Sequence, residues 1–170
     1  ACVGVLGTEP DQRYCDFLRG KIAEGIQVAQ KNLAPAQIGW TVGSLPGVPQ
    51  SRRWIARPDK LKEDPFGEKT TRATMHPGYR NPDWEEPSGP MNPDVPVIAV
   101  RRPDGRPIGL LANFSIHYVG VGAQPLSADY FGVFARRIGE ILGAEGGPQP
   151  FVGMLSNGVS GDAYLRDYSR

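Results

Sequence analysis

The residues with the clearest chemical potential lie at the end of an apolar segment. Residues 107–116 are almost continuously apolar, and His117 follows them directly. A glycine-bearing loop then leads to the Ser-Ala-Asp-Tyr stretch at 127–130, where a second regular segment begins. In open α/β sheets, ligands bind beside the carboxyl ends of strands. The sequence therefore predicts an imidazole displayed at a strand end, either as a metal ligand or as a structural histidine.

A second group of polar residues follows the last apolar segment. Residues 151–155 read Phe-Val-Gly-Met-Leu, and the loop 156–162 that follows reads Ser-Asn-Gly-Val-Ser-Gly-Asp. The glycines at 158 and 161 permit a tight turn at the strand end, which is the structural interpretation of this loop. The alternative is a role in holding an oxyanion or the substrate. A hydroxyl nucleophile in this loop would also need an adjacent base.

Basic side chains outside these segments have two possible roles. Arg52 and Arg53 are adjacent, and a guanidinium can donate a fork of hydrogen bonds to a carbonyl, hydroxyl or carboxylate. The alternative is a solvated pair in a charged loop that also contains Arg57 and Lys60, where ion pairs are weak. His76 is interpreted as a solvated loop histidine and is left out of the metal site.

The N-terminal half predicts one helix, one strand and a long excursion. Apolar residues recur at three- and four-residue intervals from 10 to 33, which indicates one face of a helix. Thr8 is its expected N-cap, and Pro35 follows its expected end. Residues 37–42 predict a strand. Residues 43–96 are rich in proline but contain aromatic residues, Trp54, Tyr79 and Trp84 among them, which favours an ordered excursion over a linker.

A hairpin is predicted in the second half. Residues 95–101 and 107–116 have the character of strands, and the Asp104-Gly105 pair between them is typical of a hairpin turn. The second strand is so continuously apolar that we expect both of its faces to be covered.

A helix and a last strand complete the predicted order. Residues 130–142 are amphipathic, Gly143 ends the helix, and 151–155 form a buried strand. The residues expected to face inward from the helix are Phe131, Phe134, Ala135, Ile138, Ile141 and Leu142. This order predicts an α/β layered domain with a mixed β-sheet flanked by helices and one long proline-rich excursion.

Composition restricts both size and partners. The 170 residues fit a single domain, and 19 basic against 18 acidic residues provide no electrostatic footprint for nucleic acid. Cys2 and Cys15 match neither a disulfide framework nor a zinc-finger spacing, and Cys15 is interpreted as a small buried apolar residue. No run approaches the roughly 18 apolar residues that cross a bilayer, and we expect no targeting segment within this chain.

Several short motifs occur in a fixed order along the chain. They are Ala-Gln-Ile-Gly-Trp at 36–40, Ser-Arg-Arg-Trp at 51–54, Gly-Pro-Met-Asn-Pro-Asp-Val at 89–95, Asn-Phe-Ser-Ile-His at 113–117, Ser-Ala-Asp-Tyr at 127–130 and Gly-Asp at 161–162. In this order and at these intervals they resemble the N-terminal catalytic domain of the neutral/alkaline, non-lysosomal ceramidase family. The resemblance covers nearly the whole chain.

The resemblance implies a site for zinc and an N-acyl substrate. It makes His117 a zinc ligand and Arg52, Gly158 and Asp162 the candidate catalytic residues. Asp129 is either a carboxylate of the first helical turn or an acceptor that orients His117. The family's remaining zinc ligands, a histidine from a His-x-His segment, a glutamate and a tyrosine, are expected to come from outside this chain, which contains no His-x-His.

Catalytic serine placement stays open in this sequence. Family members carry a serine implicated in catalysis in a Ser-Asn-x-Gly-Asp-like loop. Matching it at Ser156-Asn157 leaves extra residues before Gly161-Asp162, whereas matching Gly161-Asp162 places Gly158 where the serine should be. A serine nucleophile and a metal-activated water are therefore both compatible with the loop.

The function implied by the resemblance is that of a zinc-dependent amidase. It would hydrolyse the N-acyl amide bond, a linear amide, of ceramide-like lipids to a sphingoid base and a fatty acid. We expect residues 1–170 to form a single domain that is an internal fragment of a larger N-terminal domain and is inactive alone. The resemblance also implies a secreted or periplasmic protein with peripheral membrane contact when complete. The alternative is a non-catalytic relative or scaffold domain that binds a small ligand at the strand-end cleft.

Overall fold

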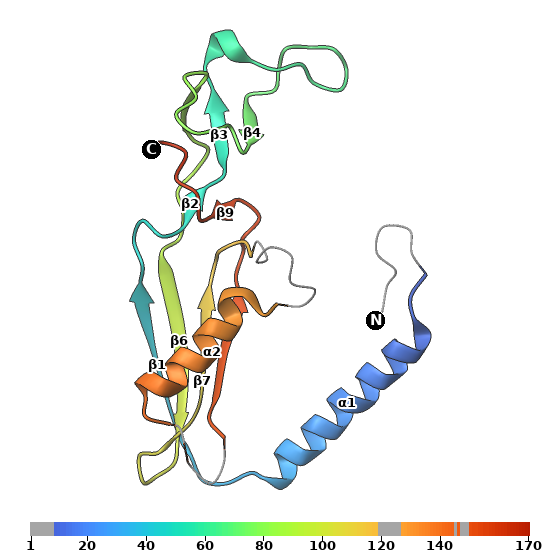
Figure 1. Cartoon of the computed structure of the whole chain (residues 1–170), viewed down its shortest axis with the longest axis vertical. Helices are drawn as coiled ribbons and strands as arrows, with labels where there is room; N and C mark the ends of the chain where they lie inside the picture. The colour runs from blue at the N-terminus through green and yellow to red at the C-terminus, as the bar shows by residue number, and fades with distance from the viewer. Residues whose placement is uncertain (1–8, 119–126, 145, 147–149) are drawn as a thin grey trace. The chain divides into compact units, whose positions relative to one another are not determined.

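The computed structural model describes residues 9–118, 127–144, 146 and 150–170. The chain divides into two compact units, residues 1–35 and residues 36–170, and each is described by itself (Figure 1). The expected single domain stays a prediction. Among the helices of the described ranges, none combines the length and the apolar character that a bilayer-spanning segment requires.

The described part of the first unit, residues 9–35, contains one helix, α1, from Gln12 to Lys31. Its N-cap is Asp11, whose carboxylate accepts the N–H groups of Arg13 at 3.0 Å and Tyr14 at 3.2 Å. The prediction of Thr8 as N-cap was therefore wrong, because an acidic side chain closer to the first turn satisfies these donors; Thr8 itself lies outside the described residues. The helix ends at Lys31 with Asn32 as its C-cap, before Pro35, as predicted.

Cys15 lies within α1 and is buried, as its apolar interpretation predicts. It also takes part in a disulfide, so it is not a free thiol. The sequence interpretation missed this bond because two cysteines so spaced form no recognisable framework. The apolar face of α1 exists, but its large side chains, Phe17 and Ile22 among them, are exposed within this unit.

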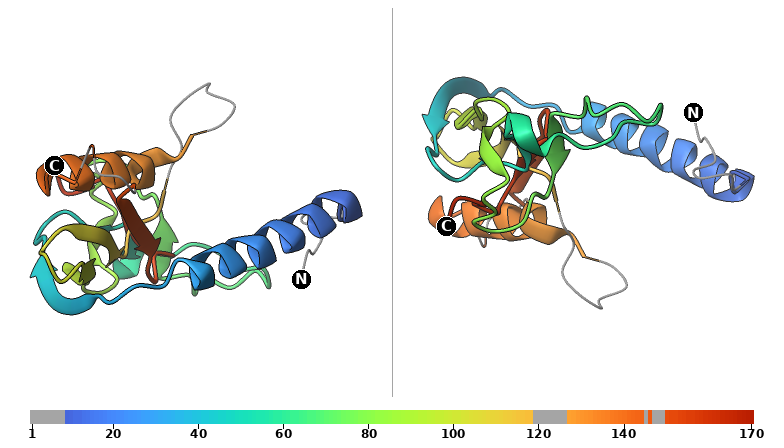
Figure 2. Two further views of the ribbon diagram at one scale, coloured as in Figure 1. Left: turned by 90° about the horizontal axis from the view of Figure 1, so that it is seen from below. Right: turned by 90° about the horizontal axis from the view of Figure 1, so that it is seen from above.

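A four-stranded mixed sheet forms the centre of the second unit. Its order is β1 (Gln37–Ser44), β6 (Asp94–Arg101), β7 (Pro107–Phe114) and β8 (Val152–Asn157). The first two pairings are antiparallel, and β7 pairs with β8 in parallel. Helix α2 (Asp129–Ile141) connects those two parallel strands and lies on one face of the sheet (Figures 1 and 2). The α/β class with a mixed sheet is thus confirmed.

Helix α2 covers only one face of β7. A side chain at Gly153, which pairs with Leu110, would meet Ile138 of α2 at 2.6 Å, so this face is in tight contact with the helix. Leu110 is buried there, whereas Leu111 on the opposite face is 38% exposed. The expectation that both faces are covered is therefore wrong for the described part of the chain.

Two of the six helical residues predicted to face inward do not. Ile141 and Leu142 are exposed, whereas Gly139 is buried against Phe151. The last turn of α2 therefore contacts the sheet through a glycine rather than through its largest side chains. Gly143 has a φ of 59° and its N–H bonds the Glu140 carbonyl, which confirms it as the end of the helix.

The predicted hairpin is present between β6 and β7. Arg102 N–H donates to the Arg106 carbonyl at 2.8 Å, and Gly105 N–H donates to the Arg102 carbonyl at 2.9 Å. Gly105 has a φ of 90°, a conformation that favours glycine. The Asp104 carboxylate accepts the Arg106 N–H at 3.1 Å. The turn chemistry read from the sequence therefore produces this connection.

The proline-rich excursion is ordered, as predicted. It contains β2 (Gln50–Ser51), β3 (Arg53–Ala56), a 3₁₀ turn (Pro58–Lys60), β4 (Ala73–Met75) and β5 (Trp84–Pro87). The last three strands form an antiparallel sheet in the order β4-β3-β5. Strand β2 instead pairs with β9 (Ala163–Tyr164) near the C-terminus (Figure 1). The excursion is therefore tied to the loop that follows β8.

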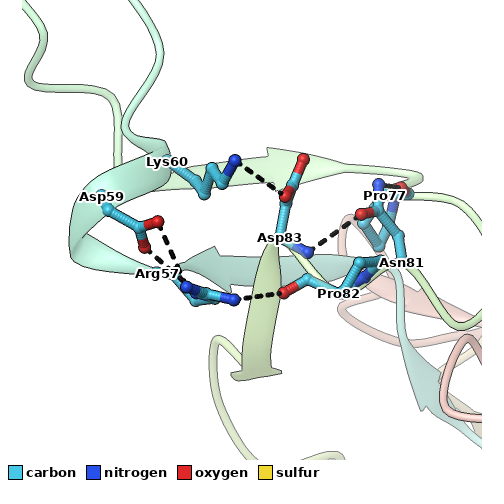
Figure 3. A network of polar contacts seen from close by, with 7 residues as sticks. All are labelled: Arg57, Asp59, Lys60, Pro77, Asn81, Pro82 and Asp83. Atoms are coloured by element: carbon cyan, nitrogen blue, oxygen red, sulfur yellow. Dashed lines mark hydrogen bonds and ion pairs between the residues drawn. The ribbon is translucent and has the colours of Figure 1, made fainter.

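A network of polar contacts links residues 57–60 and residues 77–83 of the excursion (Figure 3). Arg57 Nε donates to the Asp59 carboxylate at 3.0 Å, and Lys60 lies 3.6 Å from the Asp83 carboxylate. Asn81 accepts the Asp83 N–H at 3.0 Å and donates to the Pro77 carbonyl at 2.9 Å. The Asn81–Pro77 contact closes the turn at 77–81, and the others link the 3₁₀ turn to the segment before β5.

Candidate functional site at the carboxyl end of β7

The backbone at His117 is held from two directions. The buried residue before it, Ile116, accepts a hydrogen bond from the Tyr130 hydroxyl of α2 at 2.8 Å. His117 N–H itself donates to the Ala163 carbonyl at 2.9 Å. The chain therefore places this imidazole beyond the end of β7, as predicted, and anchors it to both α2 and β9. The predicted glycine-bearing loop after it lies largely outside the described residues.

Gly158 lies where the loop after β8 returns to the end of β7. Its N–H donates to the Phe114 carbonyl at 3.0 Å. A Cβ at this position would be 2.1 Å from Ser115 Oγ and 3.0 Å from Asn113 Oδ1, so no larger residue fits without rearrangement. At Gly161, by contrast, an added Cβ would meet nothing within 4 Å. Of the two glycines, only Gly158 is required by close approach.

Both serines of this loop have hydrogen-bond partners. Ser156 Oγ accepts from Asn113 Nδ2 at 2.8 Å and donates to the Ala112 carbonyl at 3.2 Å. Ser160 Oγ accepts from Asn157 Nδ2 at 3.0 Å. The Ser156 hydroxyl therefore connects β8 to β7, which is a structural role in this arrangement.

Arg52 crosses from the excursion to the same loop. Its Nε and Nη2 donate to the Gly161 carbonyl at 2.9 and 2.6 Å, and its backbone N–H donates to the Asp162 carbonyl at 2.9 Å. Arg53 is exposed. The fork of hydrogen bonds expected of a guanidinium is thus made by Arg52, although its acceptor is a backbone carbonyl of the chain.

Tyr164 is surrounded by the predicted residues. Its ring centroid lies 6.3 Å from that of His117, and the Arg52 guanidinium carbon lies 5.8 Å from it. The Arg166 guanidinium carbon is 6.0 Å away, and the ring of His76 is 5.2 Å away, edge to face. The structure therefore gathers His117, Arg52 and the Gly-Asp loop around one tyrosine.

His76 is exposed, as its loop interpretation predicts, but its side chain belongs to this cluster. Its ring Nδ1 lies 2.5 Å from the Tyr168 hydroxyl, and the backbone N–H of His76 donates to the Arg52 carbonyl at 2.8 Å. Partial burial of the ring, and next the positive charge of Arg52, hold the pKa of His76 below its usual value. Sequence reasoning missed this residue, Tyr164 and Tyr168, because no local spacing joins position 76 to positions 164–168.

Asp129 stands at the beginning of α2. Its carboxylate accepts the N–H of Tyr130 at 2.6 Å, and its own N–H donates to Ser127 Oγ at 3.0 Å. These contacts agree with the interpretation of a first-turn carboxylate. A role in orienting His117 stays a prediction.

The described residues do not form a complete metal site. No group of three or more histidine, cysteine, aspartate or glutamate side chains within them could hold an ion. A catalytic zinc takes about three protein ligands with one open position. The described residues around His117 fall short of that number.

One cavity among the described residues lies away from His117. Its volume is about 420 Å³, and residues from the opposite ends of the same strands line it, including Gln37, Arg101 and Pro107. A smaller cavity of about 270 Å³ lies beside Tyr168, with Trp54 and Trp84 in its wall. Neither of these two cavities is lined by Tyr164 or His117.

Comparison with known proteins shows the fold. No family model and no curated protein matches the sequence. A solved structure described as ceramidase complexed with C2 is 19% identical with a TM-score of 0.53, covering 86% of this chain and 20% of its own. Neutral ceramidase from Pseudomonas aeruginosa is 17% identical with a TM-score of 0.49, covering 84% of this chain and 19% of its own.

The first of these similarities confirms the predicted resemblance at the level of the fold. The α/β arrangement of this chain has a counterpart within a ceramidase structure. The chain spans about a fifth of the length of each of these structures.

Proposed function

We propose that this chain forms part of a zinc-dependent amidohydrolase similar to neutral ceramidase, acting on the N-acyl amide bond of ceramide-like lipids. The observation that carries the proposal is the meeting of His117, Arg52 and the Gly158–Asp162 loop at the carboxyl end of β7. Carboxyl ends of strands are where α/β folds bind ligands. The fold similarity to a ceramidase structure supports it.

Each residue of this chain has a defined part in the proposal. His117 provides an imidazole nitrogen to the metal, while its backbone stays fixed to Ala163. Arg52 holds the loop against the strand end through the Gly161 carbonyl. Gly158 allows that loop to approach Ser115 closely. A zinc ion, when bound, polarises the amide carbonyl and supplies a nucleophilic water.

The metal must have further ligands under this proposal. Among the described residues His117 is the one assigned to zinc, and they contain no three-residue cluster. The remaining ligands are expected from sequence outside this chain. The chain by itself should then bind zinc weakly and have no amidase activity.

One observation favours a second candidate, a non-catalytic relative that binds a small ligand at the same strand end. Ser156 Oγ and the Arg52 guanidinium both bond to groups of the chain itself. In such a binding module these contacts serve only to hold the surface in shape.

We also propose that the protein works outside the cytosol, in a secreted or periplasmic setting. Support comes from the disulfide of Cys15, since disulfides persist in oxidising compartments. Peripheral membrane contact follows from the proposed lipid substrate. Mass analysis of purified protein without and with reductant tests the disulfide directly: the intact bond gives a mass two hydrogens lower.

The function is tested in the natural-length protein by zinc analysis together with hydrolysis of N-acyl sphingoid substrates. We expect one zinc per chain and measurable turnover in the wild type. His117→Ala should lose most of the zinc and at least about 100-fold in kcat/KM. Tyr118→Phe, at the exposed neighbouring residue, is the matched control and should keep both.

Unchanged zinc content in His117→Ala would remove this residue from the metal site. Stoichiometric zinc without amide hydrolysis would favour the second candidate.

A further inference from the structure

We propose that His76 is a further residue of this site, held by Tyr168 so that its Nε2–H donates a hydrogen bond to an uncharged oxygen of the N-acyl substrate. The inference rests on the proposed function and adds a contact that the sequence motifs do not include. It is carried by the way the chain holds this ring.

The backbone at His76 is strained and firmly tied. Its φ is 57°, in the left-handed region that residues other than glycine seldom occupy. Its N–H donates to the Arg52 carbonyl, and the carbonyl of the buried Pro77 accepts from Asn81 within the polar network of the excursion (Figure 3). Residues kept in such conformations concentrate at functional sites.

The partner of the ring defines its tautomer. Tyr168 is 4% exposed, and burial raises the pKa of its phenol, so the hydroxyl keeps its proton. The phenolic oxygen also interacts with the Arg166 side chain, which has only donors. The hydroxyl proton is thus directed to His76 Nδ1, 2.5 Å away, and the ring proton resides on Nε2.

The position of the ring connects it to the predicted site. The His76 ring contacts the Tyr164 ring edge to face, with an interplanar angle of 75°. The centroid of the His117 ring lies 6.3 Å from that of the same tyrosine. Within the described part of the chain, His76 Nε2 has no hydrogen-bond partner. An exposed donor beside the imidazole assigned to the metal is suited to an oxygen of the ligand that lies there.

Two substitutions separate a donor role from a structural one. Glutamine places an amide N–H near the position of Nε2, whereas asparagine places it near Nδ1. Asparagine adopts a φ of 57° more readily than glutamine, so His76→Asn should be at least as stable as His76→Gln. A donor role predicts the opposite order of activity.

In the natural-length protein, His76→Gln should keep kcat/KM within about fivefold of the wild type, and His76→Asn should lose about 100-fold, as for loss of one oriented donor. Urea unfolding of both variants shows that neither result comes from misfolding. Equal activities, or higher activity in His76→Asn, would overturn the inference while wild-type turnover upholds the proposed function.

The tautomer is measured separately by NMR on histidine-labelled protein, with His76→Gln identifying the signal. We expect Nε2–H in the wild type and a mixture of tautomers in Tyr168→Phe. Nδ1–H in the wild type would overturn the inference. If the wild type hydrolyses no amide, the proposed function fails, and this measurement still decides whether Tyr168 presents His76 as an Nε2–H donor.

Discussion

The β7-α2-β8 region and the proline-rich excursion reach the same site by different means. The first region places His117 and Gly158 through parallel pairing of β7 with β8 and through the helix that connects them. The excursion has short strands and few buried residues, and it places Arg52 and His76 through individual hydrogen bonds to distant segments. The comparison shows that regular packing positions one half of the site and polar cross-links position the other.

From this comparison we expect the largest loss of stability from a steric change in the β7-α2-β8 region and the loop after it. Gly158→Ala would bring a methyl group within 2.1 Å of Ser115 Oγ, and we expect a loss of about 1–3 kcal/mol in the free energy of unfolding. Gly161→Ala, in open space three residues later, should change it by less than about 0.5 kcal/mol. Urea unfolding of the two variants measures the difference. Equal losses would mean that close packing is not what distinguishes these glycines.

A smaller loss is expected at the hairpin, at the other end of the same strands. Gly105→Val places a β-branched residue at a φ of 90°, which should cost about 1–2 kcal/mol of stability. Because the turn is remote from His117, kcat of the folded protein should not change. A specific loss of turnover in a variant that melts normally would contradict the separation between the two ends of the sheet.

The anchor between α2 and the strand end should contribute about as much as one hydrogen bond. Tyr130→Phe removes the donor to the Ile116 carbonyl and should lower the unfolding free energy by about 1 kcal/mol. Since His117 directly follows Ile116, we expect zinc affinity to fall together with the unfolding free energy. Full zinc affinity in a destabilised variant would show that the bond supports the fold and not the imidazole.

The weakest effect is expected in the excursion, where the contacts are partly exposed. Arg52→Ala should cost less than about 1 kcal/mol of global stability, since exposed polar contacts contribute little. It should still speed amide hydrogen exchange at residues 161–163 by up to about tenfold, because the Gly161 carbonyl loses its partner. Arg53→Ala is the matched control and should leave exchange there unchanged. The same exchange rate in both variants would disprove the cross-link.

The sequence by itself determined the elements whose residues interact locally. The three- and four-residue spacing of apolar residues predicted α1 and α2, and the Asp104-Gly105 pair predicted the hairpin. The continuous apolar run before His117 predicted the strand end. Such patterns are readable because helical turns, hairpin turns and strands depend on residues near one another in the chain. The order of motifs also indicated the fold that the ceramidase structure shares.

Only the tertiary structure decided what joins the two halves of the site. The β2–β9 pairing, the Arg52 fork on Gly161 and the contact of His76 with Tyr168 connect residues roughly a hundred positions apart. No local pattern encodes them, because each depends on where the excursion returns to the sheet. The exposure of Leu111 likewise follows from which face α2 covers. An apolar sequence indicates that burying the strand is favourable, but the packing of other elements decides which of its faces is buried.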